Sequence, residues 1–186
     1  ANPGAGRFSQ EATDWQGYRQ AGVTRLSLGV QSFDAASLKA IGRVHDATDS
    51  LEATRAAAKV FDRLNIDLMY GLPGQSLEMA MHDLETALSF GLGHLSLYQL
   101  TLEPNTLFAS RPPVLPVDDV LEAMHDQLLS RLAASELDRY EVSAFAQEGQ
   151  ACRHNTNYWR FGDYLGIGAG AHSKLSLPDL GVIRQT

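Results

Sequence analysis

Three polar side chains lie where a sheet could present them to a small ligand. Gln31 directly follows the apolar segment RLSLGV (25–30), Arg43 ends a short helical segment, and Asp67 lies early in the apolar run IDLMYGLPG (66–74). An amide and a carboxylate can hold the polar groups of a ligand, and a guanidinium can pair bidentately with a carboxylate. Each residue also has a structural alternative. Gln31 is then a strand-terminal amide that caps the next helix or bonds the backbone, Arg43 a cation near a helix C-terminus, and Asp67 a buried acid that is hydrogen-bonded to a neighbouring loop.

A second group of reactive types lies in CRHNTNYWRFGDYLGIGAGAHSK, residues 152–174. Cys152 and His154 could ligate a metal, but two ligands are too few for a closed zinc site. The segment GIGAG (166–170) lacks the spacing and the following helix of a phosphate-binding loop, and instead predicts close backbone approach. Because Cys152 is the chain's one cysteine, an internal disulfide and an all-thiolate metal site within it are excluded.

The elements that must position these residues alternate between strands and helices. Apolar runs predict strands, and stretches with helical periodicity predict helices. This order predicts an α/β fold with parallel strands, right-handed crossovers and helices covering a nearly continuously apolar sheet. Ligands of such sheets bind at the carboxyl ends of the strands. The expected strands are 25–30, 66–74, 94–100 and 139–146, and the expected helices are 15–23, 34–43, 50–64, 76–91 (with Ser76 as N-cap) and 118–135.

A proline-rich segment interrupts this alternation. EPNTLFASRPPVLPV (103–117) holds four of the seven prolines, which cannot lie inside a helix or a central strand. We expect a long irregular connection near a site.

Composition limits the class of partner. The 186 residues carry a formal net charge of −7, without a Lys/Arg run, which disfavours nucleic acid. No apolar stretch approaches the ~20 residues that span a bilayer, and ANPGAGRFSQ at the start lacks the apolar core of a signal peptide. A single cysteine fits a cytoplasmic protein.

Seven ordered segments together resemble one family, the radical-SAM heme chaperones HemW, which are relatives of oxygen-independent coproporphyrinogen III oxidase (HemN). The resemblance implies part of a radical-SAM partial (β/α)₆ barrel over 1–103, a Pro-rich connection over 104–116, and the start of a HemN-type C-terminal region over 117–186. The segments are ANPG, GVTRLSLGVQSF, IGRVH, IDLMYGLPGQS, LSLYQLTLEPNTLF, RPPVLP and CRHNTNYWRFGDYLGIGAGAHSK.

The resemblance also implies cofactors. Intact members bind a [4Fe-4S] cluster through CxxxCxxC and S-adenosylmethionine (SAM) at its open iron. Gln31, Arg43 and Asp67 match family positions that line the SAM pocket. The cluster motif is absent here, so we expect a C-terminal portion of a longer protein that does not reconstitute a cluster by itself. No catalytic residue and no metal ligand is assigned.

The word HNTNYW (154–159) matches the HNxxYW word of the chaperone branch. It implies a heme-handling region in which His154 is a candidate axial ligand and Cys152 a second one. The alternative is a packing motif in which His154 and Asn155 bond the backbone. The expected function is heme binding and delivery to an acceptor protein, which could be membrane-associated. The alternative is oxidative decarboxylation of coproporphyrinogen III, and a third reading is a fragment that folds poorly or dimerises through open strand edges.

Overall fold

The computed structural model describes residues 15–168, 170–177, 179 and 181–185. They form two compact units that divide after Gln150, and each is described by itself. The ANPG segment lies outside the described residues. The expected family boundary at 104–116 stays a prediction, and the helix that follows it, 118–133, belongs to the first unit.

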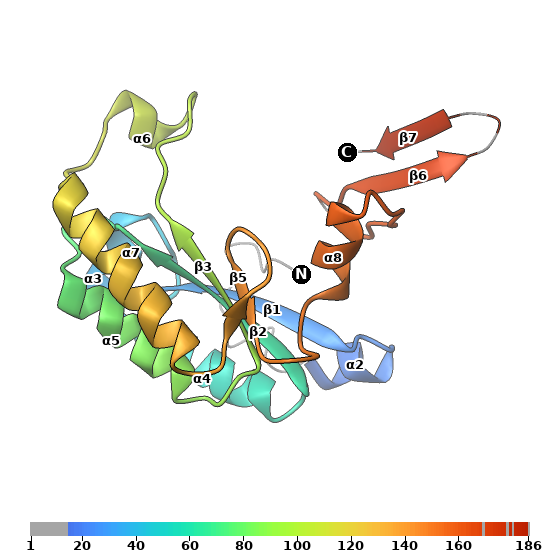
Figure 1. The fold of residues 1–186 in the computed structure, drawn as a ribbon, viewed down its shortest axis with the longest axis horizontal. Coiled ribbons are helices and arrows are strands. Elements are labelled where there is room, and N and C mark those ends of the chain that lie inside the picture. Colours follow the sequence, from blue (N-terminus) through green and yellow to red (C-terminus); the bar gives the residue numbers. More distant parts are fainter. Residues whose placement is uncertain (1–14, 169, 178, 180, 186) are drawn as a thin grey trace. The chain divides into compact units, whose positions relative to one another are not determined.

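The first unit is built on a five-stranded mixed sheet (Figure 1). The first three strands are parallel, as their alternation with helices predicts. The expected strand 139–146 is wrong as one element, because the chain turns back on itself and Tyr140 N–H donates to the Ala144 carbonyl at 3.2 Å. The two short strands that result are antiparallel to each other, and the second is antiparallel to β3. The spatial order is β1 (Arg25–Gln31), β2 (Arg63–Tyr70), β3 (His94–Gln99), β5 (Ala144–Ala146) and β4 (Asp138–Arg139).

The helices begin where side chains cap them. Ser76 caps α5 by accepting a hydrogen bond from Met79 N–H, as predicted. Asp46 and Asp49 form a capping box that starts α4 at Ala47, earlier than expected. The expected helix 50–64 is also too long, because Arg63 already pairs with β1. The helices of this unit are α2 (Trp15–Gln20), α3 (Ala35–Ala40), α4 (Ala47–Ala58), α5 (Leu77–Leu88), α6 (Leu107–Ser110) and α7 (Asp118–Ala133).

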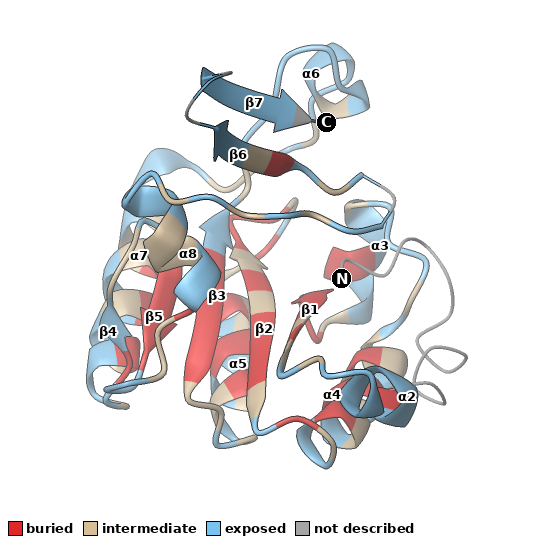
Figure 2. Ribbon diagram, turned by 90° about the vertical axis from the view of Figure 1, so that its right-hand side faces the viewer, coloured by how far each residue is buried: buried red, intermediate tan, exposed pale blue. Residues whose placement is uncertain are grey.

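The two faces of the parallel strands differ in chemistry. Leu28, Ile66 and Leu95 are at most 1% exposed and form the core with residues of α4, α5 and α7, which lie on one side of the sheet (Figures 1 and 2). The opposite face carries Asn65 and Asp67 in β2, together with polar residues of β1 and β3. The expectation of nearly continuously apolar strands is therefore wrong, since alternate positions are polar on this face.

The second unit consists of a helix and a hairpin, α8 (Arg153–Trp159), β6 (Ser173–Leu177) and β7 (Gly181–Gln185). The two strands pair antiparallel, and Tyr164 bridges to Lys174. In neither unit is there, within the described ranges, a helix of the length and apolarity that crossing a membrane requires.

Candidate functional site

Gln31 is the last residue of β1 and adopts a strained conformation. Its φ is +70°, which is uncommon for a residue with a side chain. Ser32 N–H donates to the Val30 carbonyl at 2.9 Å, so Gln31 is the central residue of the rarer, positive-φ kind of γ-turn. The strand register shifts between Leu28 and Gln31, and the glutamine is only 7% exposed. Strained residues of this kind persist where the surrounding structure fixes them, and they gather at ligand sites.

Two groups from distant elements hold this turn. His45 Nε2 lies 3.2 Å from the Val30 carbonyl, and burial is the main cause that lowers the pKa of His45. Because a carbonyl can only accept, Nε2 carries the proton in this contact. On the other side, Asp83 of α5 accepts from Ser32 Oγ at 2.7 Å and from Phe33 N–H at 2.6 Å. Burial raises the pKa of Asp83 to about 6 in spite of these hydrogen bonds.

Arg43 belongs to the connection that brings His45 back to β1. Helix α3 ends at Ala40, and Arg43 N–H donates to the Leu38 carbonyl at 2.9 Å. The Arg43 side chain is exposed, and its charge contributes to lowering the pKa of His45. The structure thus places Gln31 and Arg43 at the same end of the sheet, where β1 leads into α3.

Asp67 lies within β2, on the polar face of the sheet. It accepts a hydrogen bond from Asn65 Nδ2 at 2.7 Å, and Ser27 Oγ lies 3.4 Å from each of its carboxylate oxygens. Burial is the largest influence on this carboxyl group and raises its pKa, although hydrogen bonds from Asn65 and Ser96 act in the opposite direction. Asp67 thus has the partners that a buried acid requires, and its hydrogen bonds join β2 to Ser27 of β1.

The hydrogen bonds continue from Asn65 to His94 and Tyr140. Because the Asn65 amide nitrogen faces Asp67 and Ser27, its oxygen faces His94 Nδ1 at 2.6 Å. The Asn65 oxygen at 2.6 Å is a closer partner of Nδ1 than Arg25 Nη2 at 3.3 Å, so Nδ1 carries the proton, and His94 Nε2 accepts from the Tyr140 hydroxyl at 2.7 Å. Burial, with the charges of Arg25 and Arg63 nearby, lowers the pKa of His94 to about 3, so the ring is neutral.

A cleft of about 460 Å³ lies among the segments that follow the strands. The connection between α3 and α4 contributes Ile41 and Gly42, next to Arg43, and the segment after β3 contributes Thr101, Glu103 and Phe108. Its volume is in the range of small-molecule sites.

The HNTNYW word forms α8 in the second unit. The His154 side chain is exposed, with its ring edge-on to Tyr164 at a centroid distance of 5.1 Å. Cys152 is buried at the start of the same helix. No set of three His, Cys, Asp or Glu side chains within the described ranges is placed to hold a metal ion.

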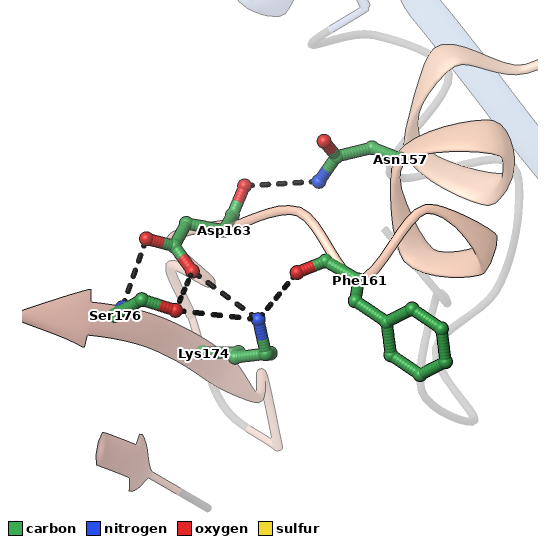
Figure 3. Close-up of polar contacts among 5 residues, drawn as sticks. All are labelled: Asn157, Phe161, Asp163, Lys174 and Ser176. Atoms are coloured by element: carbon green, nitrogen blue, oxygen red, sulfur yellow. Dashed lines mark hydrogen bonds and ion pairs between the residues drawn. The ribbon is translucent and has the colours of Figure 1, made fainter. Parts of the chain in front are cut away.

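A set of polar contacts joins the end of α8 to β6 (Figure 3). Asn157 Nδ2 donates to the Asp163 carbonyl at 2.9 Å, and Lys174 Nζ donates to the Phe161 carbonyl at 2.6 Å. The Asp163 carboxylate accepts from both N–H and Oγ of Ser176, each at 2.8 Å. These contacts fix the segment that follows HNTNYW.

The close approach expected of GIGAG is confirmed at Gly166. A Cβ built there would lie 2.2 Å from the backbone carbonyl oxygen of His172. Any side chain at this position would displace the backbone.

Comparisons with known proteins agree on one family. The profile of the Radical SAM superfamily matches residues 8–87. A relative named heme chaperone HemW from Escherichia coli (strain K12) is 50% identical over 187 aligned residues, which cover 100% of this chain and 48% of the relative. The chain belongs to the radical SAM superfamily. This membership implies SAM and a [4Fe-4S] cluster for the family as a whole.

Further relatives extend the comparison. A heme chaperone HemW of Bacillus subtilis (strain 168) is 40% identical over 83% of this chain and 42% of the relative. Radical S-adenosyl methionine domain-containing protein 1, mitochondrial, of Mus musculus is 44% identical over 83% of this chain and 36% of the relative. The radical SAM chain described here thus spans about half the length, or less, of these curated relatives.

The fold expectation is confirmed by a solved structure. The radical SAM enzyme coproporphyrinogen III oxidase (HemN) from Escherichia coli matches with a TM-score of 0.71 at 23% identity, over 87% of this chain and 41% of that one. At this identity the likeness concerns the fold alone.

Sequence reasoning did not single out four residues of the radical SAM unit that position the site: His45, Asp83, His94 and Tyr140. Asp83 carried a usable signal, because an acid on the core-facing side of an otherwise apolar helix face requires a partner. His45 lies inside the IGRVH word. His94 and Tyr140 come together only through the pairing of β3 with β5, which sequence periodicity does not give.

Proposed function

We propose that this chain is part of a radical-SAM heme chaperone, which binds heme and delivers it to an acceptor protein. The name of the relatives that are 40–50% identical supports this function. The structural observation that carries the site is the buried glutamine in a strained turn at the carboxyl end of β1. The acceptor is a heme-dependent protein, and we expect the chaperone to act in the cytoplasm.

In this proposal Gln31, Arg43 and Asp67 hold SAM. The residues fit such a ligand, because they offer an amide at the carboxyl end of β1, an exposed guanidinium in the connection after α3 and a half-buried carboxylate within β2. The Arg43 guanidinium pairs with the ligand's carboxylate, and the Gln31 amide and the Asp67 carboxylate take its other polar groups. SAM supplies a reactive sulfonium when bound. The described residues do not fit a [4Fe-4S] cluster, which needs cysteine ligands, and no step is assigned to one.

We assign heme to the second unit through His154. Its imidazole is exposed and lies edge-on to Tyr164, so a ring nitrogen is accessible to an iron. The contacts that join α8 to β6 give this helix a fixed support (Figure 3). We also propose that residues 104–116 connect the barrel portion to the family's C-terminal region.

The experiment uses the full-length protein and two assays. The first is a heme titration followed at the Soret band, with His154→Ala compared with His172→Ala, an exposed histidine of the same unit. The second is the decarboxylation of coproporphyrinogen III under anaerobic conditions with SAM. We expect one heme per chain, a weaker and spectrally altered complex for His154→Ala, wild-type binding for His172→Ala, and no decarboxylation.

The results also discriminate among the alternatives. If heme binding is lost with Cys152→Ser but not with His154→Ala, the proposed chaperone function stands, and the heme ligand is Cys152 instead of His154. Turnover of coproporphyrinogen III would overturn the proposed function in favour of the oxidase. The absence of any heme binding would overturn the proposed function without supporting the oxidase.

A further inference from the structure

The conformation of Gln31 needs support from outside its own segment. A γ-turn with positive φ at a glutamine is unfavourable by itself, and the single turn hydrogen bond from Ser32 N–H to the Val30 carbonyl does not fix the direction of the chain that follows. The two residues after Gln31, Ser32 and Phe33, are both buried, at 0% and 7% exposure. Whatever binds them determines where the Gln31 side chain is presented.

Asp83 is that group. It projects from α5, is 2% exposed, and uses its two carboxylate oxygens on two neighbouring groups of the turn, Oδ2 for Ser32 Oγ and Oδ1 for Phe33 N–H. Both hydrogen bonds go to a carboxylate. Hydrogen bonds to an ionised acceptor are shorter and stronger than those between two neutral groups. The Ser32 hydroxyl in turn accepts from Asp34 N–H at 3.0 Å, so the acid fixes the start of α3 as well.

The same carboxylate also reaches the next loop along the sheet. Gln75 lies between β2 and α5, is 3% exposed, and its Nε2 is 3.4 Å from Asp83 Oδ2. Its Oε1 accepts from Leu72 N–H at 3.1 Å, which closes the loop that follows β2. Asp83 therefore joins the loops that leave two adjacent parallel strands at their carboxyl ends, where ligands of such sheets bind.

We propose that Asp83 is a positioning residue for the ligand site: it sets the turn at Gln31 and couples the β1–α3 loop to the β2–α5 loop, so that the glutamine amide faces the ligand in a fixed orientation. The inference rests on the proposed function for the identity of that ligand, SAM. A buried carboxylate is a poor choice for packing alone, because desolvation disfavours its charged form and an apolar side chain would fill the space. A carboxylate is suited to this position because the strained turn presents two buried donors, Ser32 Oγ and Phe33 N–H, and each needs an acceptor.

The test uses the full-length protein, with its iron–sulfur cluster reconstituted, and a graded set of variants. Asp83→Leu removes both acceptors and keeps the branched shape and the number of side-chain heavy atoms, whereas Asp83→Asn keeps an oxygen for Phe33 N–H and rescues part of the interaction. Asp62→Asn is the matched control, because the side chain of Asp62 is 90% exposed. Gln31→Ala reports the contribution of the glutamine itself. Two quantities are measured on folded protein: the hydrogen-exchange rate of the Phe33 amide and the dissociation constant of SAM.

We expect Asp83→Leu to accelerate exchange at Phe33 and to weaken SAM binding by about tenfold or more, as loss of an orienting partner does elsewhere. Asp83→Asn should lie between Asp83→Leu and the wild type, and Asp62→Asn should equal the wild type. If Asp83→Leu does not fold, Ser32→Ala, which removes one of the two contacts, should shift both quantities in the same direction by less.

Three results overturn parts of the account separately. Unchanged exchange at Phe33 in a folded Asp83→Leu protein would refute the role of Asp83 in holding the turn. Faster exchange with unchanged SAM affinity, while Gln31→Ala weakens SAM, would refute its positioning role. If Gln31→Ala also leaves SAM affinity unchanged, the proposed SAM site is wrong, and the exchange data alone decide whether Asp83 holds the turn.

Discussion

The carboxylate of Asp83 accepts a hydrogen bond from the backbone N–H of Phe33 at 2.6 Å, although 50 residues separate the two in the sequence. This contact links the middle of α5 to the turn that ends β1. It explains how a glutamine can hold a φ of +70° at the end of a strand in a radical SAM protein. It also places an ionisable group inside the core, with measurable consequences for stability.

Stability should respond to pH through Asp83. The pKa of Asp83 is raised in the folded protein, from an ordinary value of 3.8 to about 6, by burial and to a lesser degree by the charge of Asp34, whereas His82 opposes the shift. Ionisation therefore opposes folding, and this effect diminishes as pH falls from about 6 towards 4. We expect the unfolding free energy of the wild type to rise by about 1 kcal/mol relative to Asp83→Asn between pH 7 and pH 5. Urea unfolding of both proteins at the two pH values checks this, and a constant difference would contradict it.

His94 should give the folding stability the opposite dependence on pH, so that its contribution is lost as the pH falls. The pKa of His94 is lowered from 6.5 to about 3 because the ring is buried near Arg25 and Arg63. Between these two pH values the ring is protonated in the unfolded chain and neutral in the folded chain. This contribution to stability is complete above about pH 7 and diminishes below it. We expect the wild type to lose about 2 kcal/mol relative to His94→Gln on going from pH 7.5 to pH 5.

The control for the His94 comparison is His172→Gln, whose histidine is exposed. It should follow the wild type at both pH values. If His94→Gln also follows the wild type, His94 does not stay neutral in the fold.

Asn65 should be the most sensitive residue of the polar face. It is 1% exposed and lies between Asp67 and His94, with a short hydrogen bond to each. Asn65→Ala leaves both neighbours without these partners in a buried place, so we expect a loss of about 3 kcal/mol in chemical unfolding. Ser96→Ala removes a longer contact, of 3.2 Å to Asn65, together with the hydrogen bond by which Ser96 acts on the Asp67 carboxylate, and should lose about 1 kcal/mol. Equal losses for the two variants would contradict the central place of Asn65.

Part of this site could be predicted from the sequence. Gln31 was expected at the end of a strand because an amide follows an apolar run, and Asp67 was expected to have partners because a carboxylate within such a run is costly to bury. Their partners could not be predicted in the same way. Ser27, Asn65 and Asp67 meet through the register of two strands, and a helix residue such as Asp83 meets β1 only after the crossover is packed.

The boundaries of helices and strands were also mispredicted where tertiary pairing decides them. The propensity of SLEATRAAAKVFDRL continues past residue 60, but pairing of Arg63 with Arg25 draws the end of this segment into β2. Likewise RYEVSAFA has strand composition throughout, and only the tertiary position of β5 beside β3 decides that it folds back on itself.

The second unit offers a prediction of its own. A Cβ at Gly166 would collide with the backbone carbonyl of His172, and rigid backbone cannot move aside as a flexible side chain does. Gly166→Ala should therefore break the bridge between Tyr164 and Lys174 and increase amide exchange at both residues. Leu165→Ala, at a neighbouring residue that is 68% exposed, should leave this exchange unchanged. Protection that survives in Gly166→Ala would show that the segment tolerates a different path.

The most direct test of the account is the dissociation constant of SAM for the full-length protein carrying Gln31→Ala, with Gln20→Ala on the exposed surface of α2 as its control. We expect Gln31→Ala to bind SAM at least about tenfold more weakly than the wild type, whereas Gln20→Ala should bind with wild-type affinity. Equal affinity in all three proteins would show that the strained end of β1 does not contact the ligand, and would contradict the account.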